Sequence, residues 1–213
     1  MKSKFYVFIK TVLTPVIKIF FRVRYHGSEN EPKAEEGPYI LICNHISNPD
    51  PVFLCAGLEH QQPCYMAKKE LFKVPILGSL VKALGAYPVN RSGADVSAIK
   101  NTISALKEGR SIGIFPQGHR EKGKTPMEAN LQTGAAMIAV KAQATVFPAY
   151  IRTKNNKFKL FRRIDVYYGK PIKFEELAYD HEASGEYGRI TELMFDRVRD
   201  LYKQAEEESK RGR

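Results

Sequence analysis

The stretch NHISNPD, residues 44 to 50, places a histidine and an aspartate five positions apart, directly after the apolar run YILIC. On a continuous helix this interval separates two side chains by about 140°, and on a continuous strand by roughly 16 Å. The intervening SNP favours a turn, because Ser and Asn hydrogen-bond to nearby backbone and Pro fixes φ. Such a turn would bring the imidazole of His45 to the carboxylate of Asp50.

A histidine held in this way has the chemistry of an oriented general base. The carboxylate of Asp50 would hold one ring nitrogen of His45, and the other would face outward to accept a proton. The cysteines lack surroundings that activate a thiolate, so the expected nucleophile is a substrate hydroxyl that attacks an acyl donor. The spacing alone is weak evidence, because SNPD is also an ordinary helix N-terminus.

The elements that must position this pair alternate between strand and helix. Strand patterns occur at 38–43, 63–67, 111–115, 144–151 and 163–169, with an extended stretch at 86–91. Helix patterns start at Asn48 and recur at 75–85, 94–109, 130–143 and 187–208. This alternation predicts an α/β fold with a mainly parallel central sheet flanked by helices. Ligands bind at the carboxyl ends of such strands. His45 and the FPQGHR run, 115–120, both lie at such ends.

Composition limits the possible partners. A chain of 213 residues with 43% hydrophobic residues indicates one domain with a real core, and its net charge of +11 favours anionic partners. Three cysteines without paired spacing suggest reduced thiols in a cytosolic setting. Zinc is not expected, because neither CxxC nor HxxxH occurs, and we expect no other metal and no cofactor.

Residues 1–25 form a basic amphipathic segment ahead of the domain expected at 26–213. At helical spacing, apolar side chains share one face and basic ones another, with no acid before Glu29. Lysines interrupt the apolar run, which is too short to span a bilayer and unlike a signal peptide. Pro15 either starts a second helix or kinks a single one. The pattern predicts a helix, or helix pair, in an anionic membrane interface; packing on its own domain is the alternative. The expected contacts are Lys4, Phe5, Phe8, Lys10, Phe20 and Arg22.

Four ordered blocks resemble the glycerolipid acyltransferases, and among them the acyltransferases of 1-acyl-glycerol-3-phosphate. NHISNPD is similar to their NHx4D block, and GAYPVNR (85–91) to a block that ends in arginine. FPQGHR resembles their FPEGTR block, and VFPAYI (146–151) an apolar block with a central proline. The resemblance covers roughly residues 30–175. It implies a glycerol-3-phosphate acyltransferase-like fold and acyl transfer from a thioester to the sn-2 hydroxyl of lysophosphatidic acid, which forms phosphatidic acid in phospholipid biosynthesis.

The resemblance also implies roles for individual residues. His45 would be the general base and Asp50 would orient it. The acceptor site would include Asn44, Arg91, Gln117, Gly118 and Arg120, with Arg91 on the phosphate. Gln117 and His119 replace the glutamate and threonine usual in the family; we expect Gln117 to contact the acceptor. The donor would be acyl-acyl carrier protein or acyl-coenzyme A, and the location the cytoplasmic side of the cell membrane.

Three other interpretations remain at this point. Another lyso-lipid or glycerol 3-phosphate itself is an alternative acceptor. GHREKGKT (118–125) matches the P-loop pattern G-x4-G-K-[ST], although its interior is bulky and charged. The basic stretch around Phe158 and Phe161 suggests a nucleic-acid binder; otherwise it is a basic hairpin face that meets anionic lipid or an acidic carrier protein. We expect no nucleic-acid partner.

Overall fold

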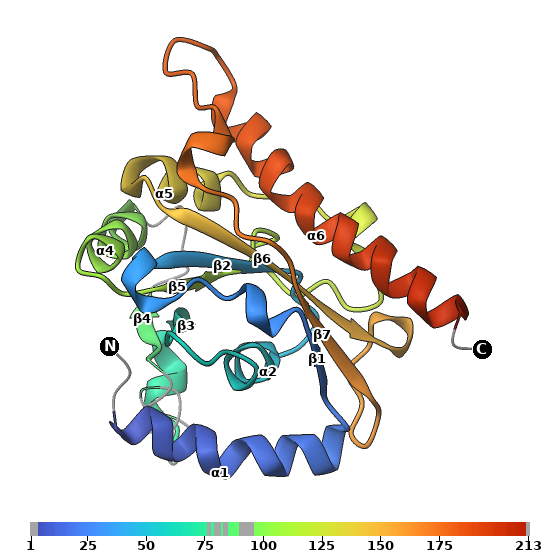
Figure 1. The fold of residues 1–213 in the computed structure, drawn as a ribbon. Coiled ribbons are helices and arrows are strands. Elements are labelled where there is room, and N and C mark those ends of the chain that lie inside the picture. Colours follow the sequence, from blue (N-terminus) through green and yellow to red (C-terminus); the bar gives the residue numbers. More distant parts are fainter. Residues whose placement is uncertain (1–3, 76–77, 79–81, 83–84, 90–95, 212–213) are drawn as a thin grey trace.

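A single twisted sheet forms the centre of the computed structural model, which describes residues 4–75, 78, 82, 85–89 and 96–211 (Figure 1). Its seven strands lie in the order β1-β7-β6-β2-β5-β3-β4. The strands are β1 (Arg24–His26), β2 (Tyr39–Cys43), β3 (Cys64–Lys68), β4 (Tyr87–Val89), β5 (Ile112–Ile114), β6 (Thr145–Thr153) and β7 (Ile164–Tyr168). Neighbouring strands are parallel except β6 and β7, which are antiparallel. The predicted mainly parallel sheet is therefore confirmed.

Helices cover both faces of this sheet (Figure 1). Their bounds are α1 (Lys4–Phe21), α2 (Asp50–Ala56), α4 (Val96–Lys107), α5 (Gly134–Ala142) and α6 (Glu186–Arg211). Helices α4, α5 and α6 pack on one face, and α1 and α2 lie on the other. Each face has its own apolar cluster, so the sheet is buried between two layers of helices.

Strand β2 shows why the run YILIC contains no polar residue. Ile40 and Ile42 point into the cluster formed with α4, α5 and α6. Tyr39, Leu41 and Cys43 point to the opposite cluster, which includes α2 and α1. All five side chains are at most 1% exposed. Because successive strand residues alternate between faces, a strand covered on both sides must be apolar throughout.

Most of the expected elements are present, with shifted ends. Helix α5 starts at Gly134 rather than 130, and α4 and α6 agree with their predicted positions to within three residues. The short strand β1, which pairs with β7, was not expected, and the predicted boundary between residues 25 and 26 falls inside it. Of the helix predicted at 75–85, most residues lie outside the described part of the chain, as does Arg91.

Helix α1 is one continuous helix, with Pro15 inside it, and it lies against the domain. Tyr6 and Ile17 are buried, and Phe21 packs edge-on against Phe53 of α2. The opposite face leaves a row of large apolar side chains in the open: Val7, Phe8, Val12, Val16, Ile19 and Phe20. Within the described residues, no helix combines the length and the apolar character needed to cross a bilayer.

The expected contact set on α1 needs one correction. Lys10 does not lie on the open face, because its ammonium group donates to the carbonyl of Leu58, just beyond α2. Phe8, Phe20 and Arg22 are exposed as expected. The side chains of Lys4 and Phe5 lie outside the described part of the structure.

Candidate active site

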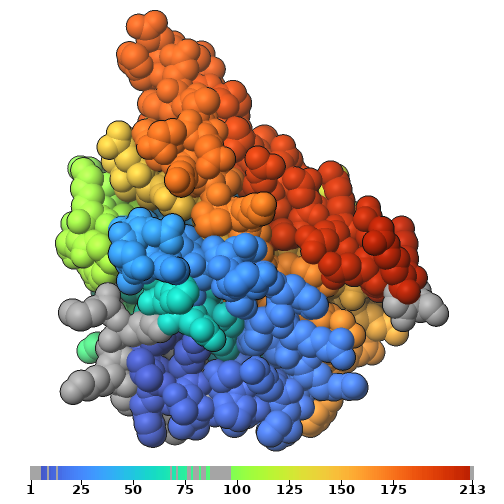
Figure 2. Space-filling view, in the orientation of Figure 1, coloured from blue at the N-terminus to red at the C-terminus, as the bar shows by residue number. Residues whose placement is uncertain are grey.

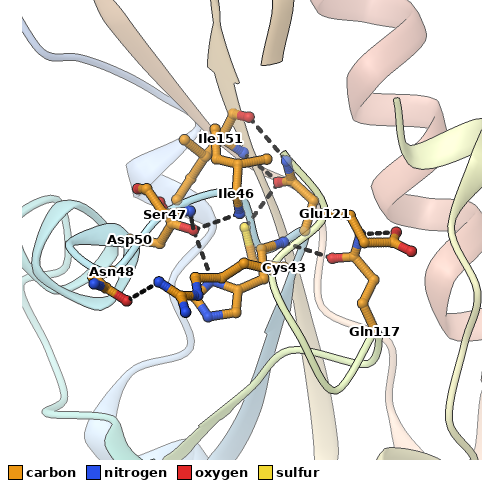
Figure 3. Close-up of polar contacts among 11 residues, drawn as sticks. Cys43, Ile46, Ser47, Asn48, Asp50, Gln117, Glu121 and Ile151 are labelled. Atoms are coloured by element: carbon orange, nitrogen blue, oxygen red, sulfur yellow. Dashed lines mark hydrogen bonds and ion pairs between the residues drawn. The ribbon is translucent and has the colours of Figure 1, made fainter. Parts of the chain in front are cut away.

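The turn that follows β2 joins the imidazole and the carboxylate as the spacing predicted (Figure 3). His45 Nδ1 lies 2.8 Å from Asp50 Oδ2. Asp50 is the first residue of α2, and its backbone N–H bonds to the carbonyl of Ser47 at 3.4 Å, which closes the turn. Nδ1 therefore donates to the carboxylate, which leaves Nε2 as the basic nitrogen of the ring.

The carboxylate of Asp50 is fully buried and accepts hydrogen bonds on both oxygens. Besides the imidazole, the N–H groups of Ile46 and Ser47 donate to Oδ2, each at 2.8 Å. The hydroxyl of Ser47 donates to Oδ1. A buried carboxylate is costly unless its lone pairs are satisfied, and four donors meet that requirement here. Asp50 is thus a fixed support for His45.

The imidazole is also held from its flat side. The ring of Phe115 stacks on it with centroids 3.9 Å apart and an interplanar angle of 12°, and Tyr65 stacks on Phe115 in turn. The side chain of His45 keeps 13% of its surface exposed, so the base is sheltered but reachable. Sequence analysis missed this support, although Phe115 belongs to the FPQGHR block.

Gln117 connects the FPQGHR block to the NHISNPD block through its side-chain amide (Figure 3). The carbonyl oxygen accepts from the backbone N–H of His45 at 2.6 Å, and the amide NH2 donates to Glu121 Oε2 at 2.6 Å. The N–H of Glu121 donates back to the carbonyl of His45 at 2.8 Å. Gln117 is 2% exposed and Glu121 4%. The polar atoms of Gln117 are thus engaged within the protein, which favours a positioning role over the acceptor contact expected from the sequence.

Asn44 also faces the interior. Its side-chain oxygen accepts from the N–H of Ile151 at 2.8 Å, and its NH2 group donates to the carbonyl of Ile151 at 3.1 Å (Figure 3). The residue is 2% exposed. This pair of bonds joins the end of β2 to β6 beyond the regular strand pairing. These bonds favour a structural role for Asn44 beside His45 over the substrate contact expected from the sequence.

The positively charged side chain of Arg120 lies at the exposed rim of the site. Arg120 Nη1 donates to Asn48 Oδ1 at 2.6 Å, so the two motif blocks meet there (Figure 3). Gly118, at φ +71°, closes the turn that begins at Phe115 by a bond of 3.0 Å to its carbonyl. That left-handed conformation favours glycine. The His119 side chain is 62% exposed and lies 3.5 Å from Glu121.

Three other nucleophilic side chains in the described part of the chain are badly placed. Burial raises the pKa of the Cys55 thiol to about 12 and that of Cys43 well above its usual value, so both stay protonated near neutral pH. GRSIG, 109–113, has the letters of a nucleophile elbow, but Ser111 precedes β5 instead of following a strand. Its hydroxyl oxygen accepts from Tyr39 N–H at 3.0 Å, away from His45.

The P-loop interpretation is wrong. In a P-loop the helix follows the lysine and threonine directly, whereas here Thr125 leads into a single 3-10 turn and α5 begins only at Gly134. The buried Glu121 also occupies the middle of the motif. A carboxylate in that position would repel a phosphate group.

A histidine–aspartate pair at the end of a parallel strand, with no nucleophilic side chain among the described residues bonded to the histidine ring, fits transfer to a substrate hydroxyl. The family model described as Acyltransferase matches residues 22–152. The chain belongs to this acyltransferase family.

Individual relatives agree with this assignment. A 1-acyl-sn-glycerol-3-phosphate acyltransferase of Bacillus subtilis is 33% identical over 92% of this chain and 96% of its own length. A protein of the same name from Streptococcus pneumoniae is 29% identical over 97% of this chain and 75% of its own length. The crystal structure of the 1-acyl-sn-glycerophosphate acyltransferase PlsC of Thermotoga maritima has the same fold, with a TM-score of 0.63, 23% identity, and coverage of 95% of this chain and 84% of that one.

Proposed function

We propose that this chain transfers a fatty acyl group from an acyl thioester to the sn-2 hydroxyl of 1-acyl-glycerol-3-phosphate, which yields phosphatidic acid. The observation that carries the proposal is the buried Asp50, which fixes His45 with Nε2 as its free base. Family membership and the names of the relatives support the choice of acceptor.

In the proposed reaction, His45 Nε2 removes the proton of the acceptor hydroxyl as the oxygen attacks the thioester carbonyl. A new ester bond forms and the carbon–sulfur bond breaks. The proton on His45 then passes to the departing thiolate. Asp50 stabilises the imidazolium that forms meanwhile, because its carboxylate accepts from Nδ1. Beyond the two substrates, the proposed step uses only side chains of the protein.

In this proposal, arginine side chains provide the positive charge that binds the phosphate group of the acceptor. Arg120 lies at the open rim, where Asn48 holds its guanidinium group next to the turn that carries His45. Arg91 ends the GAYPVNR block, and we assign it to the phosphate from the resemblance alone. A guanidinium fork suits a phosphomonoester, which presents two oxygens at once.

A product assay tests the function. The purified chain would receive a thioester donor, on carrier protein or on coenzyme A, and a panel of acceptors, with mass spectrometry of the products. We expect phosphatidic acid from lysophosphatidic acid, and at least tenfold lower kcat/KM for lysophosphatidylcholine. The reason is that one charged hydrogen bond contributes about 1.5–3 kcal/mol. Equal rates for both acceptors, or no ester product, would contradict the proposal.

Gln117 and Glu121 act, in this proposal, as positioning residues that fix the backbone of His45. Gln117→Glu would place a second carboxylate about 2.6 Å from Glu121, and like charges at that distance oppose each other. We expect this variant to lose about 1–3 kcal/mol of stability and to have a lower kcat. The swap of Gln117→Glu with Glu121→Gln restores one amide and one carboxylate, and should recover both quantities.

The measurements are a thermal melt and steady-state kinetics with the acceptor varied. Recovery in the double variant supports the hydrogen bonds that link Glu121, Gln117 and the backbone of His45. A direct contact between Gln117 and the acceptor would not predict this recovery. A raised acceptor KM in Gln117→Glu that the swap leaves unchanged would instead return Gln117 to the acceptor site.

We further propose that α1 attaches the chain to the cytoplasmic side of the cell membrane, in the lipid interface. Its open face carries large apolar side chains, with Lys18 and Arg22 exposed beside them. Its other face packs on α2, so removing residues 1–24 would expose Phe53 and delete the start of β1. Point variants on the open face are therefore better tests than truncation.

Phe8→Ser combined with Ile19→Ser is expected to lower sedimentation with anionic vesicles by at least tenfold, because these side chains are 61% and 73% exposed and would lose their apolar contact with lipid. Added salt should weaken binding of the parent. Met127→Ser is the control, since Met127 is 51% exposed on another part of the surface. Unchanged sedimentation of the double variant would contradict the role of α1.

A further inference from the structure

We propose that the hairpin between β6 and β7, residues 154–163, is a second lipid-contacting element that enters the same anionic membrane interface as α1. The proposal rests on the interfacial attachment proposed above and extends it to a distant part of the sequence. Figure 1 shows this hairpin reaching the same edge of the molecule as the C-terminal end of α1.

The tip of the hairpin exposes apolar side chains. Leu160 is 57% exposed and Phe161 is 64% exposed. Phe161 also adopts a positive φ of 61°, a costly conformation for a bulky residue. Adjacent large apolar side chains at the surface mark a binding site more often than isolated ones do.

Aromatic contacts join the hairpin to α1. The ring of Phe161 lies 5.8 Å from that of Phe20, which is itself 43% exposed, and the ring of Phe158 lies 5.4 Å from Phe21. The apolar surface of the hairpin therefore continues that of α1 without a gap. In Figure 2 the α1 surface, in dark blue, and orange atoms lie beside each other at the lower edge.

The charges around this apolar tip match an anionic lipid surface. Lys154, Lys157 and Lys159 are exposed on the hairpin, Lys18 is exposed on α1, and Arg22 is exposed directly after it. Arg163 is engaged with Asp165, so we do not count it among the charges directed at lipid. Each basic residue near an anionic membrane adds to the electrostatic attraction, and five of one sign reinforce one another.

A lipid surface fits this combination better than an acidic protein does. The exposed apolar side chains continue from Phe161 through Phe20 along the open face of α1, so the contact is long. A membrane interface accepts apolar side chains below the headgroups and lysines at their level. An acidic carrier protein would need the lysines but would leave Leu160 and Phe161 partly in water.

The chain contains no tryptophan, which allows a probe at a single site. In three separate variants, Phe161→Trp, Phe8→Trp and Met127→Trp, the emission would be recorded with phosphatidylglycerol vesicles, with phosphatidylcholine vesicles, and with acyl carrier protein. We expect a blue shift, and quenching by brominated lipid, for Phe161→Trp and Phe8→Trp on anionic vesicles only. Met127→Trp should not respond.

Two results would overturn the proposal. One is a response of Phe8→Trp to vesicles without a response of Phe161→Trp, which would leave α1 as the membrane element and the hairpin outside it. The other is a response of Phe161→Trp to acyl carrier protein but not to vesicles, which would make the hairpin a protein-docking site.

Activity separates this inference from the function it extends. Leu160→Ser with Phe161→Ser should lower binding to anionic vesicles by about tenfold or more, and should lower acylation of long-chain lysophosphatidic acid in vesicles. Acylation of a short-chain, monomeric acceptor should stay within twofold of the parent. Equal activity on the vesicle substrate would contradict the role of the hairpin. If the parent acylates neither acceptor, the proposed function itself fails.

Discussion

Replacing His45 with alanine is expected to lower kcat for acyl transfer by about 100- to 10,000-fold, the usual contribution of a general base. In the proposed reaction Asp50 acts on the substrate through this imidazole, and no other base is bonded to that carboxylate in the described structure. The measurement is steady-state kinetics with lysophosphatidic acid and an acyl thioester, beside a circular dichroism melt that checks the fold.

His181→Ala is the matched control, because the side chain of His181 is 81% exposed and lies in the segment before α6. It should keep the parent kcat. If His45→Ala retained more than about a tenth of the parent rate while folding normally, proton removal by His45 would not be the basis of catalysis.

The second large effect is expected for Asp50→Asn, with a loss of up to about 10,000-fold in kcat. Asparagine offers one acceptor oxygen and an NH2 group, which cannot accept from the N–H groups of Ile46 and Ser47. The imidazole would then adopt the wrong tautomer or orientation. The turn should also lose about 1–3 kcal/mol of stability, which corresponds to roughly 2–12 °C in Tm for a chain of this size.

Ser47→Ala distinguishes the two consequences of Asp50→Asn. It removes only the hydroxyl donor to Oδ1 and leaves the bond between Nδ1 and Oδ2 in place. We expect a lower Tm with kcat within about tenfold of the parent. If Ser47→Ala and Asp50→Asn lowered kcat equally, the loss would come from the turn as a whole and not from orientation of the imidazole.

The central fold was predictable because its signals are local. The runs before His45 and before FPQGHR are too apolar for anything but buried strands, and a ligand site at their carboxyl ends follows from the parallel arrangement. The turn between His45 and Asp50 was likewise predictable from SNP. These inferences needed no knowledge of contacts between distant segments.

The supports of the site were not predictable, because each depends on partners far away in the sequence. Gln117 is 72 residues from His45, whose N–H it accepts, and Asn44 is 107 residues from Ile151. Lys10 looked like a solvated charge, yet it reaches a carbonyl 48 residues away. Polar residues in a motif invite assignment to a substrate, and only coordinates show that another part of the protein already uses their hydrogen bonds.

The link between Asn44 and Ile151 fixes how far the turn that carries His45 lies from the hairpin. Ile151 lies in β6, three residues before the hairpin begins at Lys154. Because a strand rises about 3.3 Å per residue, roughly 10 Å of rigid backbone separates the residue that holds the catalytic turn from the segment proposed to enter the lipid. If the hairpin lies among the headgroups, the length of β6 sets the distance between the imidazole of His45 and the acyl chains of the lipid. A longer or shorter strand would move His45 farther from or closer to the membrane, and so out of register with the glycerol backbone of the acceptor.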